Sequence, residues 1–367
     1  MAMKQAKPLY RQIYEFLYEN ICADTFKKGR LPTDGQLMRK FATTRATVAK
    51  AMRELEMAGL IERRPGAGTV VRPAIKTHGA FVSTLIAGLG DTAFFEPICA
   101  QIAQSCHACN LNLLWGPDSH STALARDASV AHVIEHFHRQ NVKGVFFAPD
   151  EGVDAVTFRR NQQIAERLTH SGIAVVLLDR DVVAFPEQGA YDLVGIDNMN
   201  AGFQQVKHLV EMGCTRIAYV TRPGQLWTKD ARLFGFKLAI EQFKLDRTAC
   251  PVFCGDVADV RFCETILKSN PDGIACFHDP IAVVLVQHLR QRHIAVPQRV
   301  KLIGLDDVSY SSFLPIPITT LRQPCRSIGA QAAELMALRI NNDQHPPRRI
   351  LFDTQLIVRA SSLKKDE

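Results

Sequence analysis

Apolar residues recur at helical spacing in three segments before residue 60. Pro8 opens the first segment, because proline suits the first turn of a helix. Thr33 and Thr44 precede the other two as N-cap residues, and Gln36 stands at the capping-box position after Thr33. The two shorter segments flank Thr43, so the pattern predicts a helix-turn-helix. The faces expected to be buried are Leu9, Ile13, Phe16, Leu17 and Ile21, then Leu37, Met38 and Phe41, and last Val48, Met52 and Leu55.

A short hairpin is predicted after the third helix, which Gly59 suits as a C-terminal residue. Residues 60–63 and 69–71 have the composition of strands, and residues 64–68 contain the proline and glycines of a turn. A basic hairpin beside a helix-turn-helix is typical of a winged helix, whose recognition helix enters the major groove with its N-terminal residues first. We therefore predict a DNA-binding domain over residues 1–72.

Residues 73–79 are polar and contain proline and glycine, which predicts a linker. From residue 80 onward, apolar runs of strand length alternate with amphipathic segments, and this alternation predicts parallel sheets with right-handed crossovers. The remaining chain, 80–367, is long for one sheet, so we expect an α/β fold with two doubly wound parallel sheets in two lobes. The expected strands are 81–86, 111–115, 144–147, 174–178, 193–196, 216–220, 273–277 and 300–305, and expected helices include 97–109, 201–212 and 281–291.

Polar side chains follow several of the predicted strands, where a ligand of an open α/β sheet usually binds. Carboxylates accept hydrogen bonds from hydroxyl groups and arginine donates them in a fixed fork, so these residues suit a polyol in a cleft between the lobes. Phe95 and Trp227 could cover the apolar face of a sugar ring. The strand-end residues are Asp150, Asp179 and Arg180, His278 and Asp279, and Asp306 and Asp307.

The net charge of +7 is concentrated at one end of the chain. Residues 1–75 contain 14 Lys and Arg against 7 Asp and Glu, whereas the other residues contain 30 of each. A basic head on a neutral body indicates a polyanion partner for the head.

Composition excludes several classes of protein. With 47% hydrophobic and 22% charged residues, the chain is neither disordered nor transmembrane, and no export signal is evident at its start. The 10 cysteines are scattered, and the close pairs Cys106/Cys109 and Cys250/Cys254 are better explained as packed thiols than as zinc ligands. We expect a cytoplasmic protein without a metal, a cofactor or a membrane partner.

Residues 8–72 resemble the winged helix of GntR-type regulators, and the resemblance implies DNA contacts at Arg45, Thr47 and Gly66. The pattern departs from the family at Gly35 and Ala49, where arginines that touch DNA are usual, so the operator should differ from the family norm. The matching strings are Leu31-Pro32-Thr33, Thr44-Arg45-Ala46-Thr47-Val48, Gly59-Leu60-Ile61 and Gly66-Ala67-Gly68-Thr69-Val70-Val71.

Residues from about 81 to 358 resemble the effector domain of LacI/GalR repressors, which is similar to periplasmic sugar-binding proteins. The resemblance implies a ligand-binding arginine at Arg232, a ligand-binding carboxylate at Asp306 and a polar lining residue at His278, where asparagine is more usual. Val257 and Cys325 also depart from lining residues of the family. The best matching strings are Gly195-Ile196-Asp197-Asn198, Arg232-Leu233-Phe234-Gly235-Phe236, Ile303-Gly304-Leu305-Asp306-Asp307 and Thr319-Thr320-Leu321-Arg322-Gln323-Pro324.

A GntR-type head on a LacI-type body is similar to the arrangement in arabinose-responsive repressors. The resemblance implies a ligand-responsive bacterial transcription regulator, a repressor of sugar-utilisation genes whose operator binding is altered by a small sugar. The expected partners are double-stranded operator DNA, the effector and a second copy of the chain in a homodimer. The alternatives are an α/β enzyme, for which no common catalytic or nucleotide-binding motif is present, and a sensor of a purine or a sugar phosphate.

The site residues follow from position and from these resemblances. We expect DNA contacts at Thr33, Thr44, Arg45, Thr47, Lys50, Arg64, Gly66 and Gly68. We expect effector contacts at Phe95, Asp150, Arg180, Trp227, Arg232, His278 and Asp306, and no catalytic residue.

Overall fold

The computed structural model of the chain describes residues 9–22, 26, 30–57, 61–64, 68–71, 79–86, 94–116, 127–150, 155–224, 227–341 and 345–363. It divides into two compact units, Met1–His78 and Gly79–Glu367, which we call the head and the body. Among the described residues, no helix combines the length and the apolar character needed to cross a membrane.

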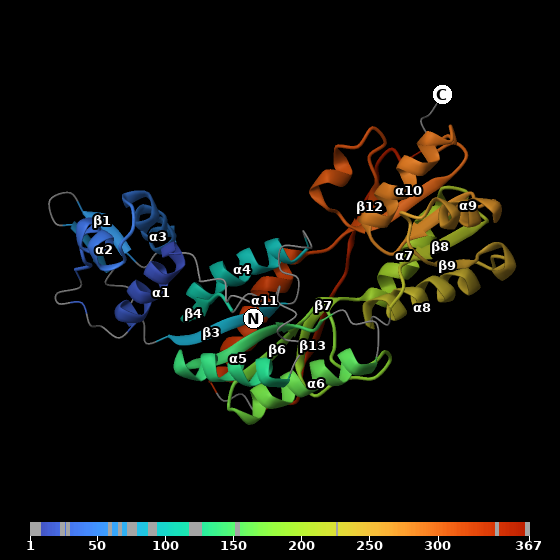
Figure 1. The fold of residues 1–367 in the computed structure, drawn as a ribbon. Helices are drawn as coiled ribbons and strands as arrows, with labels where there is room; N and C mark the ends of the chain where they lie inside the picture. The colour runs from blue at the N-terminus through green and yellow to red at the C-terminus, as the bar shows by residue number, and fades with distance from the viewer. Residues whose placement is uncertain are drawn as a thin grey trace. The chain divides into compact units, whose positions relative to one another are not determined.

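The head consists of three helices and a two-stranded antiparallel hairpin, as the sequence pattern predicts (Figure 1). Thr33 is the N-cap of the second helix and forms the predicted capping box, in which the Gln36 side chain accepts from the Thr33 amide at 2.8 Å. The core joins all three helices and includes Ile13, Leu37 and Val48, each fully buried. The elements are α1 (Leu9–Cys22), α2 (Asp34–Lys40), α3 (Arg45–Met57), β1 (Ile61–Arg64) and β2 (Gly68–Val71).

The first lobe of the body is a six-stranded parallel sheet in the order β13-β7-β6-β5-β3-β4. Helices α4 and α11 pack together on one face, and α5 and α6 cover the other (Figure 1). The elements are β3 (Ala80–Ile86), α4 (Phe95–Ala108), β4 (Leu111–Leu114), α5 (Asp127–Arg139), β5 (Val142–Ala148), α6 (Ala155–His170), β6 (Ala174–Leu178), β7 (Asp192–Ile196), α11 (Cys325–Ile340) and β13 (Arg349–Phe352).

The second lobe has a six-stranded sheet in the order β14-β12-β11-β10-β8-β9, parallel except for β14. Helices α7 and α8 pack together, and so do α9 and α10. The elements are α7 (Asn198–Glu211), β8 (Ile217–Thr221), α8 (Trp227–Gln242), the 3-10 helix η4 (Arg247–Ala249), β9 (Val252–Cys254), α9 (Val260–Lys268), β10 (Gly273–Cys276), α10 (Asp279–Gln291), β11 (Lys301–Asp306), the 3-10 helix η5 (Ser309–Ser312), β12 (Thr319–Arg322) and β14 (Gln355–Ile357).

Two doubly wound lobes are confirmed, but the chain passes between them three times. It leaves the first sheet after β7, returns after β12 to form α11 and β13, and leaves again to add β14 to the second sheet. The sequence pattern does not identify β12, β13 or β14 as strands. Each has only three or four residues, and β13 and β14 pair with strands that are not their neighbours in sequence, so local periodicity carries little signal for them.

Helices α7 and α8 approach closely because two glycines face each other's helix. A Cβ atom at Gly202 of α7 would collide with the carbonyl oxygen of Arg232 in α8. A Cβ atom at Gly235 of α8 would collide with the carbonyl oxygen of Met199 in α7. The two glycines therefore fix the position of α8 against α7. Helix α8 carries Arg232, and α7 follows the first passage of the chain between the lobes.

We expect Gly202→Ala to lower the free energy of unfolding of the body by about 1–3 kcal/mol, because the added methyl group overpacks the α7–α8 contact. In an open helix the same change would instead stabilise by roughly 0.5–1 kcal/mol. Gly35→Ala in α2 is the matched control, since no atom lies within 4 Å of the added Cβ position. Urea unfolding of the full chain measures both; stabilisation by Gly202→Ala would contradict the close helix packing.

Candidate functional site

The N-terminal end of α3 presents polar side chains to solvent. Thr44 and Arg45 are exposed and Thr47 is half-buried, while the neighbouring Val48 is fully buried. The hydroxyl oxygens of Thr44 and Thr47 lie 3.1 Å apart, so the two side chains share one hydrogen bond. Arg45 therefore stands at the exposed start of the second helix of a helix-turn-helix, the position from which such helices contact base edges.

The other residues predicted to contact DNA lie in different surroundings within the head. Lys50 is exposed, but its Nζ lies 3.8 Å from the centroid of the Tyr10 ring in α1, so it also makes a cation–π contact within the head. Thr33 is exposed and acts as the cap of α2. Arg64 and Gly68 are paired at the end of the hairpin, and Gly66 lies outside the described residues.

In the body, polar residues from both lobes meet at the ends of parallel strands. Asp179 follows β6 of the first lobe, and its Oδ2 is 2.8 Å from Nη2 of the neighbouring Arg180. Arg232 comes from α8 of the second lobe and Asp306 is the last residue of β11. Arg232 shifts the pKa of both carboxyl groups, and Asp306 shifts that of Asp179, so the three groups interact electrostatically. We call Asp179, Arg180, Arg232 and Asp306 the interlobe polar cluster.

Arg232 is held rigidly within this cluster. Its side chain is 4% exposed, its Nε donates to Oδ1 of Asn198 at 2.7 Å, and its Nη1 donates to the carbonyl oxygen of Phe277 at 3.0 Å. The guanidinium carbon lies 4.6 Å from the centre of the Phe277 ring. These contacts fix the plane of the guanidinium, which is the condition for recognising a ligand in one orientation.

Burial raises the pKa of both carboxyl groups of the cluster. The pKa of Asp179 is raised to about 6 by desolvation, although Arg232 opposes the shift, and Asp306 raises it further. The pKa of Asp306 is likewise raised to about 6 by desolvation, with Arg232 and a hydrogen bond from Gln323 opposing it. Desolvation lowers the pKa of His278 to about 4, so its imidazole is neutral. Nδ1 of His278 accepts from the Ile281 amide at 3.3 Å, which leaves the ring proton on Nε2 as a donor.

The two cluster carboxylates sit on unusual backbone. Asp179 has a φ of 67° and Asp306 a φ of 112°, both in the region that non-glycine residues rarely adopt. Residues in such conformations persist only where the surrounding structure holds them, and they gather at ligand sites.

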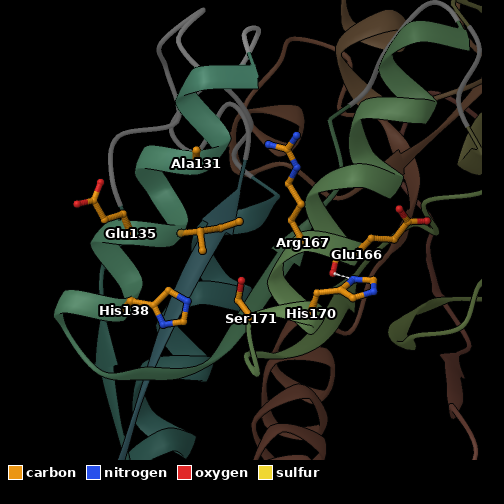
Figure 2. Close-up of a pocket in the computed structure, with 8 residues that line it drawn as sticks. Ala131, Glu135, His138, Glu166, Arg167, His170 and Ser171 are labelled. Carbon is orange, nitrogen blue, oxygen red and sulfur yellow. Dashed lines mark hydrogen bonds between the residues drawn. The ribbon is translucent and has the colours of Figure 1, made fainter.

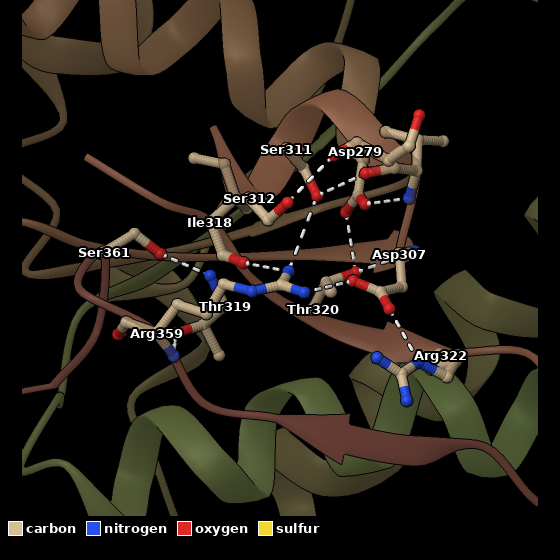
Figure 3. Close-up of polar contacts among 12 residues, drawn as sticks. Asp279, Asp307, Ser311, Ser312, Ile318, Thr319, Thr320, Arg322, Arg359 and Ser361 are labelled. Atoms are coloured by element: carbon tan, nitrogen blue, oxygen red, sulfur yellow. Dashed lines mark hydrogen bonds and ion pairs between the residues drawn. The ribbon is translucent and has the colours of Figure 1, made fainter. Parts of the chain in front are cut away.

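Figure 3 shows what holds the backbone beside Asp306. The carboxylate of Asp307 accepts from Nη2 of Arg359 and from Nε of Arg322, each at 2.6 Å. The buried carboxylate of Asp279 accepts from the Val308 amide at 3.0 Å and from the Thr320 hydroxyl at 2.7 Å. Because Asp307 is anchored in this way, it fixes the backbone of the adjacent Asp306. Asp307 is not the N-cap of η5, because that position is occupied by Val308.

Several buried polar atoms, in the cluster or on the helix α8 that carries Arg232, have no hydrogen-bond partner among the described residues. They are Oδ1 of Asp179, Oε1 of Gln323 and Nε1 of Trp227, on side chains that are 5%, 4% and 7% exposed. The other end of the Gln323 amide donates to Asp306 at 2.7 Å, which places Gln323 in the cluster. Unmet hydrogen bonds on buried groups are costly, so these two acceptors and one donor favour a bound polar ligand.

The predicted effector residues do not all belong to this site. Arg180 lies 5.9 Å from the ring of Phe95, a buried residue of α4. Asp150 is exposed and forms an ion pair with Arg160 at 3.0 Å, and no contact joins it to the cluster within the described part of the chain.

Gln323 was missed by the sequence analysis, and Asp179 was noted only as a strand-end residue. The signal for Gln323 was its place directly after the short strand β12. Asp179 has the signal of any polar residue at a strand exit, and only the fold shows that it lies within electrostatic reach of Arg232.

A separate surface pocket of about 510 Å³ lies between α5 and α6 of the first lobe, away from the predicted residues (Figure 2). It contains charges of both signs, and Nδ1 of His170 is bonded to the Glu166 carbonyl oxygen at 2.7 Å. Among the described residues, no group of three or more His, Cys, Asp or Glu is placed to hold a metal ion. The pocket is lined by Ala131, Ile134, Glu135, His138, Glu166, Arg167, His170 and Ser171.

Two family models match parts of the chain, one in the head and one in the body. Residues 9–71 match the model of bacterial regulatory proteins of the gntR family. Residues 206–362 match the model of a periplasmic binding protein-like domain.

Relatives of the whole chain and of the body are transcription regulators. The arabinose metabolism transcriptional repressor of Geobacillus stearothermophilus is 24% identical over 97% of this chain and 98% of its own length. The transcriptional repressor PurR of Aliivibrio salmonicida is 26% identical over 55% of this chain, and the chain spans 61% of that protein. The regulator CelR of Thermobifida fusca is 28% identical over 58% of this chain and 63% of its length.

Solved structures share the fold of the body. The regulator CcpA of Lactococcus lactis has a TM-score of 0.63 at 19% identity, covering 78% of this chain and all of that one. A CelR–cellobiose complex has a TM-score of 0.62 at 21% identity, covering 87% of this chain and 91% of that one. The chain thus joins a domain that matches the gntR family of bacterial regulatory proteins to a body that contains a periplasmic binding protein-like domain and shares its fold with LacI-family regulators.

Proposed function

We propose that the protein is a ligand-responsive transcription regulator, a repressor of sugar-utilisation genes whose operator binding is altered by a small sugar held between the lobes. The observation that carries the proposal is the interlobe polar cluster, a buried set of charges with unmet hydrogen bonds, on the same chain as a winged helix-turn-helix. The relatives named above support it, because they regulate transcription and one of them regulates arabinose metabolism.

The chemistry of the cluster suits a polyhydroxylated ligand. Asp179 and Asp306 accept hydrogen bonds, the guanidinium of Arg232 is held in one plane by Asn198 and Phe277 with Nη2 outside those two bonds, and Trp227 adds a donor beside an apolar ring. A structurally similar regulator holds cellobiose, and another, from Enterococcus faecium, holds ribose. A purine effector is the second candidate, since PurR proteins are among the relatives of the body.

The head is the part of the protein that would bind the operator DNA. We propose that Arg45, Thr44 and Thr47 contact the operator, helped by Lys50 and the hairpin. One head reads one half-site, so we propose that the protein acts as a homodimer. We also propose that it is located in the cytoplasm and has no catalytic activity. Effector binding then changes operator affinity only through a difference in its affinity for two arrangements of the body.

A thermal-shift screen of the full chain against pentoses, hexoses, sugar phosphates and purines tests the effector class. A ligand at a hundredfold its Kd should stabilise the body by about 2.7 kcal/mol. Stabilisation by a purine and by no sugar would overturn the sugar assignment. Stabilisation by a sugar that leaves operator affinity unchanged would overturn the coupling.

We expect Arg45→Ala to weaken operator binding roughly 5- to 150-fold, because the variant loses one bidentate contact to a base. Effector binding should be unchanged. Arg53→Ala is the control, because Arg53 is exposed on the same helix and its Nε is bonded to the Ala49 carbonyl oxygen at 3.4 Å. Fluorescence anisotropy with operator DNA gives both affinities, and equal losses in the two variants would remove Arg45 from the specific contacts.

We expect Asp306→Asn to weaken effector binding about 10- to 150-fold, because it removes a charge-assisted hydrogen bond. Operator binding without effector should stay intact. Glu264→Gln is the control, since it changes a half-exposed carboxylate that is paired with Arg292 at 3.0 Å. Isothermal titration with the effector found in the screen measures the loss. If Asp306→Asn also lost DNA binding, misfolding would be the simpler explanation.

Effector affinity should fall as the pH falls through about 6, the raised pKa of Asp179 and Asp306 in the empty site. Ligand hydroxyl groups that donate to these carboxylates favour the charged form, so the pKa of each falls on binding. Above pH 6 the carboxylates are already charged and affinity is constant; below it, binding must first expel protons. Titrations from pH 5 to 8 measure the slope, which Asp306→Asn should reduce. A flat profile in the unmodified chain would show that the carboxylates do not accept from the ligand.

A further inference from the structure

The loop between β6 and β7 has a rigid base and a projecting tip. Asp181 is 2% exposed, and its two carboxylate oxygens accept from the amides of Val182 at 2.7 Å and Gly189 at 3.0 Å. The Glu187 amide donates to the Ala184 carbonyl oxygen at 2.8 Å and closes a tight turn. One carboxylate therefore clamps both ends of the loop.

The tip of this loop carries Phe185, which leaves its own lobe and contacts helix α8 of the other. The rings of Phe185 and Trp227 have centroids 5.6 Å apart and an interplanar angle of 79°, an edge-to-face arrangement. The ring of Phe234, two turns further along α8, lies 6.0 Å away. Phe185 is half-buried and Phe234 is 52% exposed, so the contact lies at the edge of the lobes and not in a core.

A second group of the first lobe reaches the same tryptophan. The guanidinium of Arg349 in β13 lies 5.4 Å from the centre of the Trp227 ring. Arg349 also forms an ion pair with Asp181, the residue that clamps the loop. The loop, the edge strand β13 and the start of α8 are thus connected through one aromatic ring.

We propose that Phe185 and Arg349 of the first lobe, with Trp227 and Phe234 of the second, form a latch that holds the two lobes together. Each contact is weak: an aromatic pair is worth about 2- to 12-fold in an equilibrium constant. A latch of such contacts can break and re-form.

The latch and the interlobe polar cluster share helix α8. Trp227 is its first residue and Arg232 lies little more than one turn further on. When the latch opens, α8 moves away from the first lobe and carries Arg232 away from Asp179. The latch therefore sets how much of the population has a complete effector site, and hence the apparent effector affinity. This regulatory consequence rests on the proposed function, whereas the latch itself does not.

Phe185→Ala tests the latch without a ligand or DNA. Phe243→Ala is the matched control: Phe243 is also half-buried and packs on Phe203 at 5.7 Å, but both belong to the second lobe. The variants are made in the full chain carrying Trp115→Phe, so that Trp227 is the single tryptophan. Acrylamide quenching of its fluorescence reports the contact, and small-angle X-ray scattering reports the separation of the lobes.

Phe185→Ala should raise both the quenching constant and the radius of gyration, and Phe243→Ala should raise neither. Arg349→Gln, measured in the same way, serves if Phe185→Ala does not fold, and it should raise both values. Unchanged quenching would show that the contact is not formed in solution. Increased quenching with an unchanged radius of gyration would show that the contact forms but does not hold the two lobes together. An equal increase in radius for Phe243→Ala would indicate general loosening; each of these three results overturns the latch.

Discussion

Each time the chain passes between the two lobes of the body, it does so at the end of a strand. The crossings after β7, β12 and β13 bring the carboxyl ends of two parallel sheets to the same region, and with them Asp179 from one sheet and Asp306 from the other. Arg232, fixed by Asn198 and Phe277, balances these two buried charges. Buried charges are tolerated only when they are paired or hydrogen-bonded, so the same residues that suit a ligand also constrain how the lobes meet.

The head could be predicted almost completely from sequence because its signals are local. A capping box needs only Thr33 and Gln36 three positions apart, and the structure forms it as expected. The hairpin follows from two short runs of strand-like composition on either side of a turn that contains proline and glycine. The order of the body's main strands and helices was predictable for the same reason, since each has its own periodicity.

The parts that sequence did not reveal depend on contacts between distant residues. Strand β13 pairs with β7 across more than a hundred residues, and its four residues are too few for a periodic signal. The φ of 112° at Asp306 results from anchors on Asp307 and Asp279, which no local pattern encodes. Asp150 lies at the end of a strand as predicted, but it forms an ion pair with Arg160 of its own lobe.

The placement of β13 and β14 has a consequence for synthesis of the protein on the ribosome. Each lobe obtains one edge strand from residues 349–357, and the second lobe also buries Ser361 and Ser362 against β11, β12 and α7. The head can fold as soon as its own residues emerge, but neither lobe can complete its sheet until almost all of the body has been translated. During that interval the edges of β7 and β12 lack their partner strands, and unpaired edges of this kind are prone to pair with other chains.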